Sequence, residues 1–98
     1  MYKILLLPSA KKDITQSIKW YKNKAGEYTS DRFKSIVFTE IENLKSDFTD
    51  NAKISNGLNR KILKKFPIVI YYLKEDSFII IFGVLHNKRS RAIIEGRI

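Results

Sequence analysis

The chain contains no cysteine among its 98 residues, so disulfide bonds and cysteine-ligated zinc are both excluded. The longest uninterrupted apolar run, from Phe78 to Leu85, is eight residues long, whereas a membrane-spanning helix needs about 20. There is one histidine, and the four glycines are isolated from one another, so the sequence offers neither a metal-ligand set nor a glycine-rich phosphate loop. We therefore expect no metal ion, no cofactor and no membrane association.

Acidic residues are also scarce, with 10 Asp+Glu against 19 Lys+Arg and a net charge of +9. Residues 49–98 carry a surplus of six positive charges, against three in residues 1–48. Such a surplus attracts polyanions or acidic proteins. The hydrophobic content of 44% is that of a folded protein, and the length predicts a single domain over residues 1–98. The apolar patch Ile4–Leu7 is too short for a signal peptide, so we expect a cytoplasmic protein.

Apolar periodicity predicts a strand and two helices in the first half of the chain. Residues Tyr2–Leu7 are typical of a short buried strand. A helix is expected to begin at Pro8, with Ser9 as its N-cap, and to end between Asn23 and Gly26. A second helix carries an apolar stripe at a spacing of 3.6 residues, formed by Phe33, Val37, Ile41, Leu44 and Phe48. The two helices should form a hairpin.

Three strands are predicted after a polar loop at residues 49–59. They are Arg60–Phe66, Ile68–Leu73 and Phe78–His86, with a turn at Lys74–Ser77. The strand from Phe78 is the most apolar and should lie at the centre of the sheet. The tail Asn87–Ile98 either extends the sheet or docks on it. The order β-α-α-β-β-β predicts an α+β fold in which a helical hairpin packs on one face of a mainly antiparallel sheet.

Two basic clusters are candidates for binding. The first consists of Arg60, Lys61, Lys64 and Lys65, with Lys53 shortly before them. Strand alternation would place Arg60, Ile62, Lys64 and Phe66 on one face, and Lys61, Leu63 and Lys65 on the other. One interpretation is that these charges protect an edge strand from aggregation. The other is that Arg60 and Lys64 line the open face of the sheet and contact phosphates or a carboxylate-rich partner.

The second cluster follows the most apolar strand and contains His86, Lys88, Arg89 and Arg91. A histidine at a strand end is commonly a hydrogen-bonded structural residue, but it is also a natural general base for RNA cleavage through the 2′-OH. In that second interpretation, arginine would bind phosphate or stabilise the transition state.

Most aromatic residues fall at helical positions, and we expect them to pack in the core or between the helices. They are Trp20, Tyr21, Tyr28, Phe33, Phe38 and Phe48. Only Tyr71 or Tyr72, alternating on a strand, is expected to offer an exposed ring to a nucleic-acid base.

As a set, these residues resemble the RelE/ParE superfamily of bacterial toxins, and most closely its ParE-like branch, often labelled plasmid-stabilisation proteins. The resemblance covers nearly the whole chain. It rests on Ala10, Asp13 and Ile14, on Trp20-Tyr21, on Phe33 and Leu44, on Arg60, on the stretch from Phe66 to Tyr72, and on Val84-Leu85-His86 with Arg89.

The resemblance implies a growth-inhibiting toxin of a type II toxin–antitoxin system, neutralised by a small acidic antitoxin, in a complex that can bind operator DNA. ParE-like members poison DNA gyrase, which is the expected activity here. The alternative is a ribosome-dependent mRNA interferase, a metal-independent endoribonuclease with Arg60, His86 and Arg89 as catalytic residues. In either case the basic residues Lys53, Arg60, Lys64, Lys88, Arg89 and Arg91 would bind the target or its phosphates.

Overall fold

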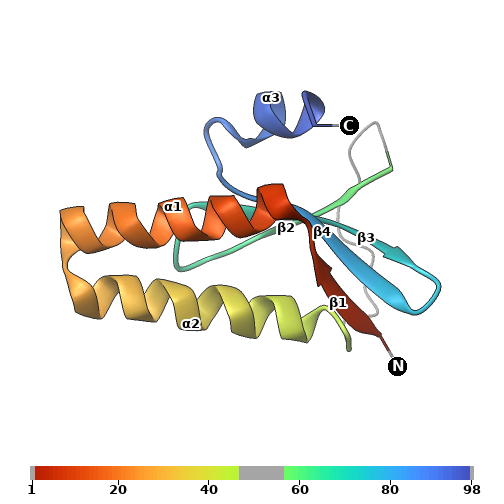
Figure 1. The fold of residues 1–98 in the computed structure, drawn as a ribbon, viewed down its shortest axis with the longest axis horizontal. Coiled ribbons are helices and arrows are strands. Elements are labelled where there is room, and N and C mark those ends of the chain that lie inside the picture. The colour runs from red at the N-terminus through yellow and green to blue at the C-terminus, as the bar shows by residue number, and fades with distance from the viewer. Residues whose placement is uncertain (1, 47–56, 98) are drawn as a thin grey trace.

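The computed structural model describes residues 2–46 and 57–97 (Figure 1). These residues form four strands and three helices: β1 (Lys3–Leu6), α1 (Pro8–Ala25), α2 (Glu27–Asn43), β2 (Asn59–Ile62), β3 (Ile68–Glu75), β4 (Phe78–His86) and α3 (Ser90–Glu95). The strand order in the sheet is β1-β4-β3-β2, with β1 parallel to β4 and the other pairs antiparallel. The predicted α+β fold is confirmed, and β4 lies between two strands as its apolar sequence indicated.

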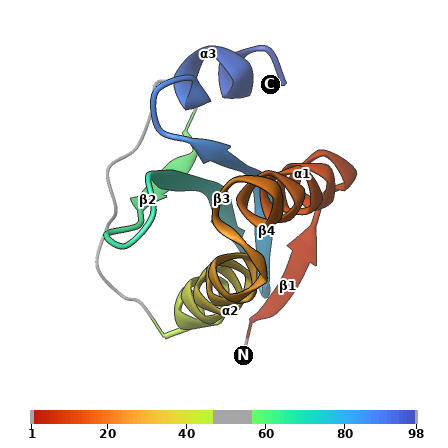
Figure 2. The same ribbon diagram turned by 90° about the vertical axis from the view of Figure 1, so that its left-hand side faces the viewer.

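The helices α1 and α2 run antiparallel as a hairpin on one side of the sheet (Figure 2). Pro8 suits the first turn of α1 because that position needs no backbone donor. Gly26 alone separates the helices, with a φ of 91° that other residues rarely adopt. The expectation that Ser9 caps α1 is wrong: Leu7 is the N-cap, and the Ser9 hydroxyl donates instead to the carbonyl of Phe82 at 3.3 Å.

The larger core lies between this hairpin and the sheet. Its helical side contains the predicted stripe, of which Phe33, Val37 and Leu44 are completely buried, together with Ala10 and Ile14 of α1. Residue Phe48, the last of the predicted stripe, lies outside the described residues. The sheet contributes the alternate residues that face the hairpin: Ile68, Ile70, Tyr72, Ile79, Ile81 and Val84.

The opposite face of the sheet carries a smaller core beneath α3. Val69, Tyr71 and Leu85 from the strands pack with Leu58 and with Ile94 of α3, which is completely buried. The Tyr71 hydroxyl and the Ser90 hydroxyl are hydrogen-bonded at 2.7 Å. The tail therefore docks on the sheet as a short helix and does not extend it.

Three details of the predicted strands are wrong. Strand β1 lies at an edge and Leu5 is 46% exposed, so this strand is only partly buried. Strand β2 ends at Ile62, and the chain then bends, so Lys64 and Lys65 do not alternate along a strand. The hairpin turn is only two residues long, Asp76 and Ser77. None of the helices in residues 2–46 and 57–97 has the length and apolar character that a membrane crossing requires.

Candidate functional site

A groove of about 580 Å³ lies between α1 and the end of β4. One wall is formed by Gln16, Ser17 and Trp20 of α1, and the other by His86, Lys88 and Arg89, at and after the end of β4. We call this the α1–β4 groove. It exists because β1 is short: β1 pairs with β4 only as far as Ile81, while β4 continues to His86. Helix α1 replaces β1 along the remaining length of β4.

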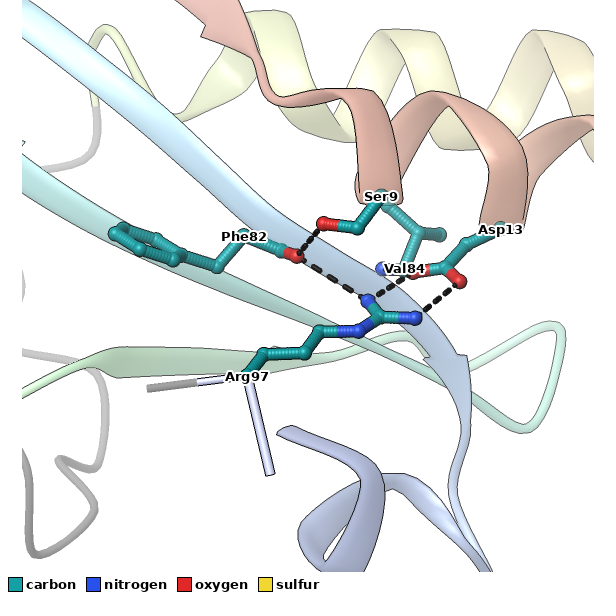
Figure 3. Close-up of polar contacts among 5 residues, drawn as sticks. All are labelled: Ser9, Asp13, Phe82, Val84 and Arg97. Atoms are coloured by element: carbon teal, nitrogen blue, oxygen red, sulfur yellow. Dashed lines mark hydrogen bonds and ion pairs between the residues drawn. The ribbon is translucent and has the colours of Figure 1, made fainter. Parts of the chain in front are cut away.

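Replacing a strand by a helix leaves backbone groups of β4 without ladder partners, and side chains satisfy them (Figure 3). The Val84 N–H donates to the Asp13 carboxylate at 3.0 Å. The Phe82 carbonyl accepts hydrogen bonds from the Ser9 hydroxyl and from the Arg97 guanidinium, both at 3.3 Å. The start of α1 is thereby fixed against the centre of the sheet.

Arg97 also forms a two-pronged ion pair with Asp13, with N···O distances of 2.7 and 2.8 Å. The Asp13 side chain is 6% exposed and the Arg97 side chain 24%. The hydrogen bond to Asp13 raises the pKa of Arg97 above its ordinary value, with a smaller Coulombic contribution, while partial burial acts in the opposite direction. Asp13 is thus fully engaged: it neutralises Arg97, holds the C-terminal segment on the sheet and is unavailable as a free catalytic carboxylate.

The cationic wall of the α1–β4 groove has no such partner. His86, Lys88 and Arg89 are exposed, and their side chains form no ion pair or hydrogen bond with the described residues. Arg91, by contrast, pairs with Glu95 on the surface of α3 at 3.3 Å. The groove therefore presents uncompensated positive charge to solvent.

The facing wall carries an aromatic ring that the sequence predicted to pack in the core or between the helices. Trp20 is 56% exposed, with its ring edge-to-face against Tyr21 at 5.0 Å between centroids. Tyr21 in turn packs on Phe33 and Phe66, at 4.8 and 5.1 Å, and burial raises the pKa of its phenol. The exposed ring of Trp20 is thus supported by a cluster of aromatic rings formed by Tyr21, Phe33 and Phe66.

Other aromatic predictions also fail. Tyr28 is 81% exposed and Phe38 39% exposed, although both were expected to pack in the core or between the helices. Either Tyr71 or Tyr72 was expected to offer an exposed ring, but both are buried. Helical spacing identified Phe33 correctly, but it did not distinguish the buried stripe from aromatic residues beside it.

The basic residues predicted to act together lie in different places. Arg60 pairs across β2 and β3 with Tyr71, which faces α3. His86 pairs with Ile68, which faces the helical hairpin. Because directly paired residues share a sheet face, Arg60 and His86 lie on opposite faces. The Arg60 Nε atom is buried and has no hydrogen-bond partner in the described part of the chain.

The remaining candidates are also separated. Lys64 lies in a second groove, of about 460 Å³, between α2 and the segment after β2, together with Lys61 and Lys65. Lys61 is paired there with Glu40 at 3.3 Å. Lys53 lies outside the described residues. His86, Lys88 and Arg89 thus share the α1–β4 groove, whereas Lys61, Lys64 and Lys65 share the second groove. Within residues 2–46 and 57–97 no cluster of side chains could hold a metal ion.

The family model described as "ParE toxin of type II toxin-antitoxin system, parDE" matches residues 4–91. The chain belongs to this ParE toxin family. Among solved structures, it is similar to the "Chromosomal ParDE TA system from P. aeruginosa", with a TM-score of 0.75. The two chains are 12% identical, and the similarity covers 88% of this chain and 96% of the other. A search of curated proteins finds no match.

The residues that line the α1–β4 groove lie within the segment that matches the ParE family. Asp13, Trp20 and the basic wall all lie within the segment that matches the ParE family, whereas Arg97 lies beyond it. Asp13 is one of the residues in which this ParE toxin resembles its family, but its partner Arg97 could not be found from the sequence. The two residues are 84 positions apart, and no local pattern connects them.

Proposed function

We propose that this ParE-family toxin inhibits DNA gyrase and is neutralised by a cognate antitoxin. Membership of the ParE family supports a toxin, and the residues of the ParE-like branch support gyrase as its target. The proposed site of action is the cytoplasm, where gyrase and chromosomal DNA are located.

The observation that favours gyrase over mRNA cleavage is the separation of Arg60 from His86. In the alternative function, Arg60 and Arg89 would stabilise the charge that develops on a phosphate while His86 moves a proton. Such groups must lie within hydrogen-bond reach of one reacting phosphate. Here Arg60 is on the α3 face and His86 on the hairpin face. A toxin that acts by binding a protein needs no such convergence.

The charge of the chain favours an acidic antitoxin. A net charge of +9 on 98 residues steers an acidic partner towards the toxin and disfavours partners of like charge. We propose a small acidic antitoxin encoded next to the toxin, and a complex of the two that binds operator DNA through the antitoxin.

Purified toxin should be added to a gyrase supercoiling assay, with a sample premixed with the product of the adjacent reading frame as the control. The expected result is loss of supercoiling and accumulation of cleaved DNA, both prevented by the antitoxin. Normal supercoiling at concentrations that arrest growth would refute the proposal. A translating extract should be assayed in parallel: cut transcripts that become intact with the variants His86→Ala and Arg60→Ala would instead identify an mRNA interferase.

A further inference from the structure

We propose that the α1–β4 groove binds single-stranded nucleic acid, with a base stacked on Trp20 and the adjoining phosphates held by Lys88 and Arg89. The proposal rests on three observations: an exposed indole on one wall, cations that form no ion pair with any described residue on the other, and a volume of about 580 Å³ between them. That volume lies within the range of small-ligand sites, about 300–1,000 Å³. The inference is independent of the gyrase proposal.

The position of Trp20 is the first argument. It is the single tryptophan of the chain. It lies within α1, away from the helix ends, and more than half of its surface is exposed. Its contact with Tyr21 is edge-to-face. Since Tyr21 is anchored by Phe33 and Phe66, the indole is supported from the core while it faces the groove. An exposed and supported ring is what base stacking requires.

The electrostatics of the groove are the second argument. Asp13 is the one carboxylate among its lining residues, and Arg97 neutralises it. Lys88 and Arg89 are exposed and have no ion pair with any described residue. Arginine can donate two parallel hydrogen bonds to a phosphate, and lysine adds a compact charge. The groove is therefore a net positive site.

The combination of these features favours nucleic acid over an acidic peptide. Both ligands would engage the cations, but the Asp and Glu side chains of an acidic peptide have no flat ring to stack on an indole, whereas every nucleotide carries one. A single strand alternates flat bases with phosphates along its length, which matches an aromatic wall opposite a cationic wall. The indole of Trp20 can stack on any of the bases, so we expect the groove to bind single strands with little sequence preference.

Trp20 provides a direct assay because no other tryptophan contributes to fluorescence. The 98-residue toxin should be titrated with oligo-dT, with oligo-U and with poly-glutamate at matched charge. Both oligonucleotides are expected to quench Trp20 and to bind more tightly than poly-glutamate. Absence of quenching, or stronger binding of poly-glutamate, would overturn the proposal, the second result identifying an acidic-protein site.

Variants separate specific binding from general charge attraction. In K88Q/R89Q, we expect a loss of affinity of at least about 10-fold and a salt dependence of log K that is shallower by about 1.4, because two phosphate contacts are removed. The control R32Q/K34Q removes two exposed charges from α2 and should change affinity much less. Equal losses in both double variants would refute a defined groove.

The stacking contact has its own matched pair of variants. Trp20→Leu should weaken binding of a labelled oligonucleotide, measured by anisotropy, by about 5- to 150-fold. Tyr28→Leu removes a ring that is 81% exposed on α2 and should leave the affinity unchanged. If both variants bind like the original, no base stacks on Trp20. Because gyrase is absent from these binding assays, a failure to bind oligonucleotides would not affect the proposal that the toxin inhibits gyrase. Normal supercoiling in the gyrase assay would likewise not affect the proposal that the groove binds single strands.

Discussion

The ion pair between Asp13 and Arg97 gives the most demanding test of how this fold is held together. We predict that Arg97→Gln destabilises the protein far more than the loss of an ordinary surface charge. Arg97 lies in the last turn of the described chain, yet its guanidinium contacts both the start of α1 and the centre of β4. Its removal leaves the Asp13 carboxylate buried with the Val84 N–H as its remaining partner.

The magnitude follows from burial. Removing one partner of a fully buried ion pair costs about 3–5 kcal/mol, because the other charge is left uncompensated. Here Asp13 is 6% exposed, but Arg97 is 24% exposed and so already partly solvated. The Val84 N–H also continues to stabilise the carboxylate. We therefore expect a loss of about 2–3 kcal/mol in the free energy of unfolding.

The measurement is urea unfolding followed by far-ultraviolet circular dichroism, since Trp20 is too exposed to report unfolding well by fluorescence. The matched control is Arg91→Gln, which breaks the pair with Glu95 on the surface of α3. With side chains 57% and 48% exposed, that pair should contribute less than about 0.5 kcal/mol. A double-mutant cycle with Asp13→Asn should give a coupling energy of about 1–2 kcal/mol. A coupling near zero, or equal effects of the two arginine variants, would refute the reasoning.

Three further substitutions test the two cores by the same unfolding measurement. Gly83→Ala should cost about 1–3 kcal/mol, because the added methyl group would lie 3.0 Å from the Arg97 guanidinium; unchanged stability would mean that Arg97 is not held in place. Tyr71→Phe removes the hydrogen bond to Ser90 and should cost about 1 kcal/mol, a prediction that fails if stability rises. Phe33→Ala, at a completely buried position, should cost about 3–5 kcal/mol, and a loss below 1 kcal/mol would place this ring outside the core.

The candidate site was only partly predictable, because sequence spacing carries information about neighbours along the chain and little about faces across a sheet. His86, Lys88 and Arg89 are close in sequence, and the structure does bring them to one groove. Arg60 was grouped with His86 and Arg89 as a catalytic residue of the alternative mRNA interferase, but the strand register places it on the other face. The groove wall formed by Trp20 went unpredicted because an aromatic residue within an amphipathic helix usually packs inward.

The sequence by itself determined the order of the first strand, the two long helices and the three later strands, because apolar periodicity, Pro8 and Gly26 act locally on the backbone. It left open how the tail that forms α3 would pack. It also determined that β4 is central, since a strand buried on both faces must be apolar throughout. Only the tertiary structure decided which charged side chains form ion pairs with other described residues and which face solvent. Asp13 is neutralised by a residue from the other end of the chain, whereas Lys88 and Arg89, in the groove that Trp20 also lines, form no ion pair within residues 2–46 and 57–97. Those outcomes depend on how far β1 extends along β4, which is a property of packing between distant segments.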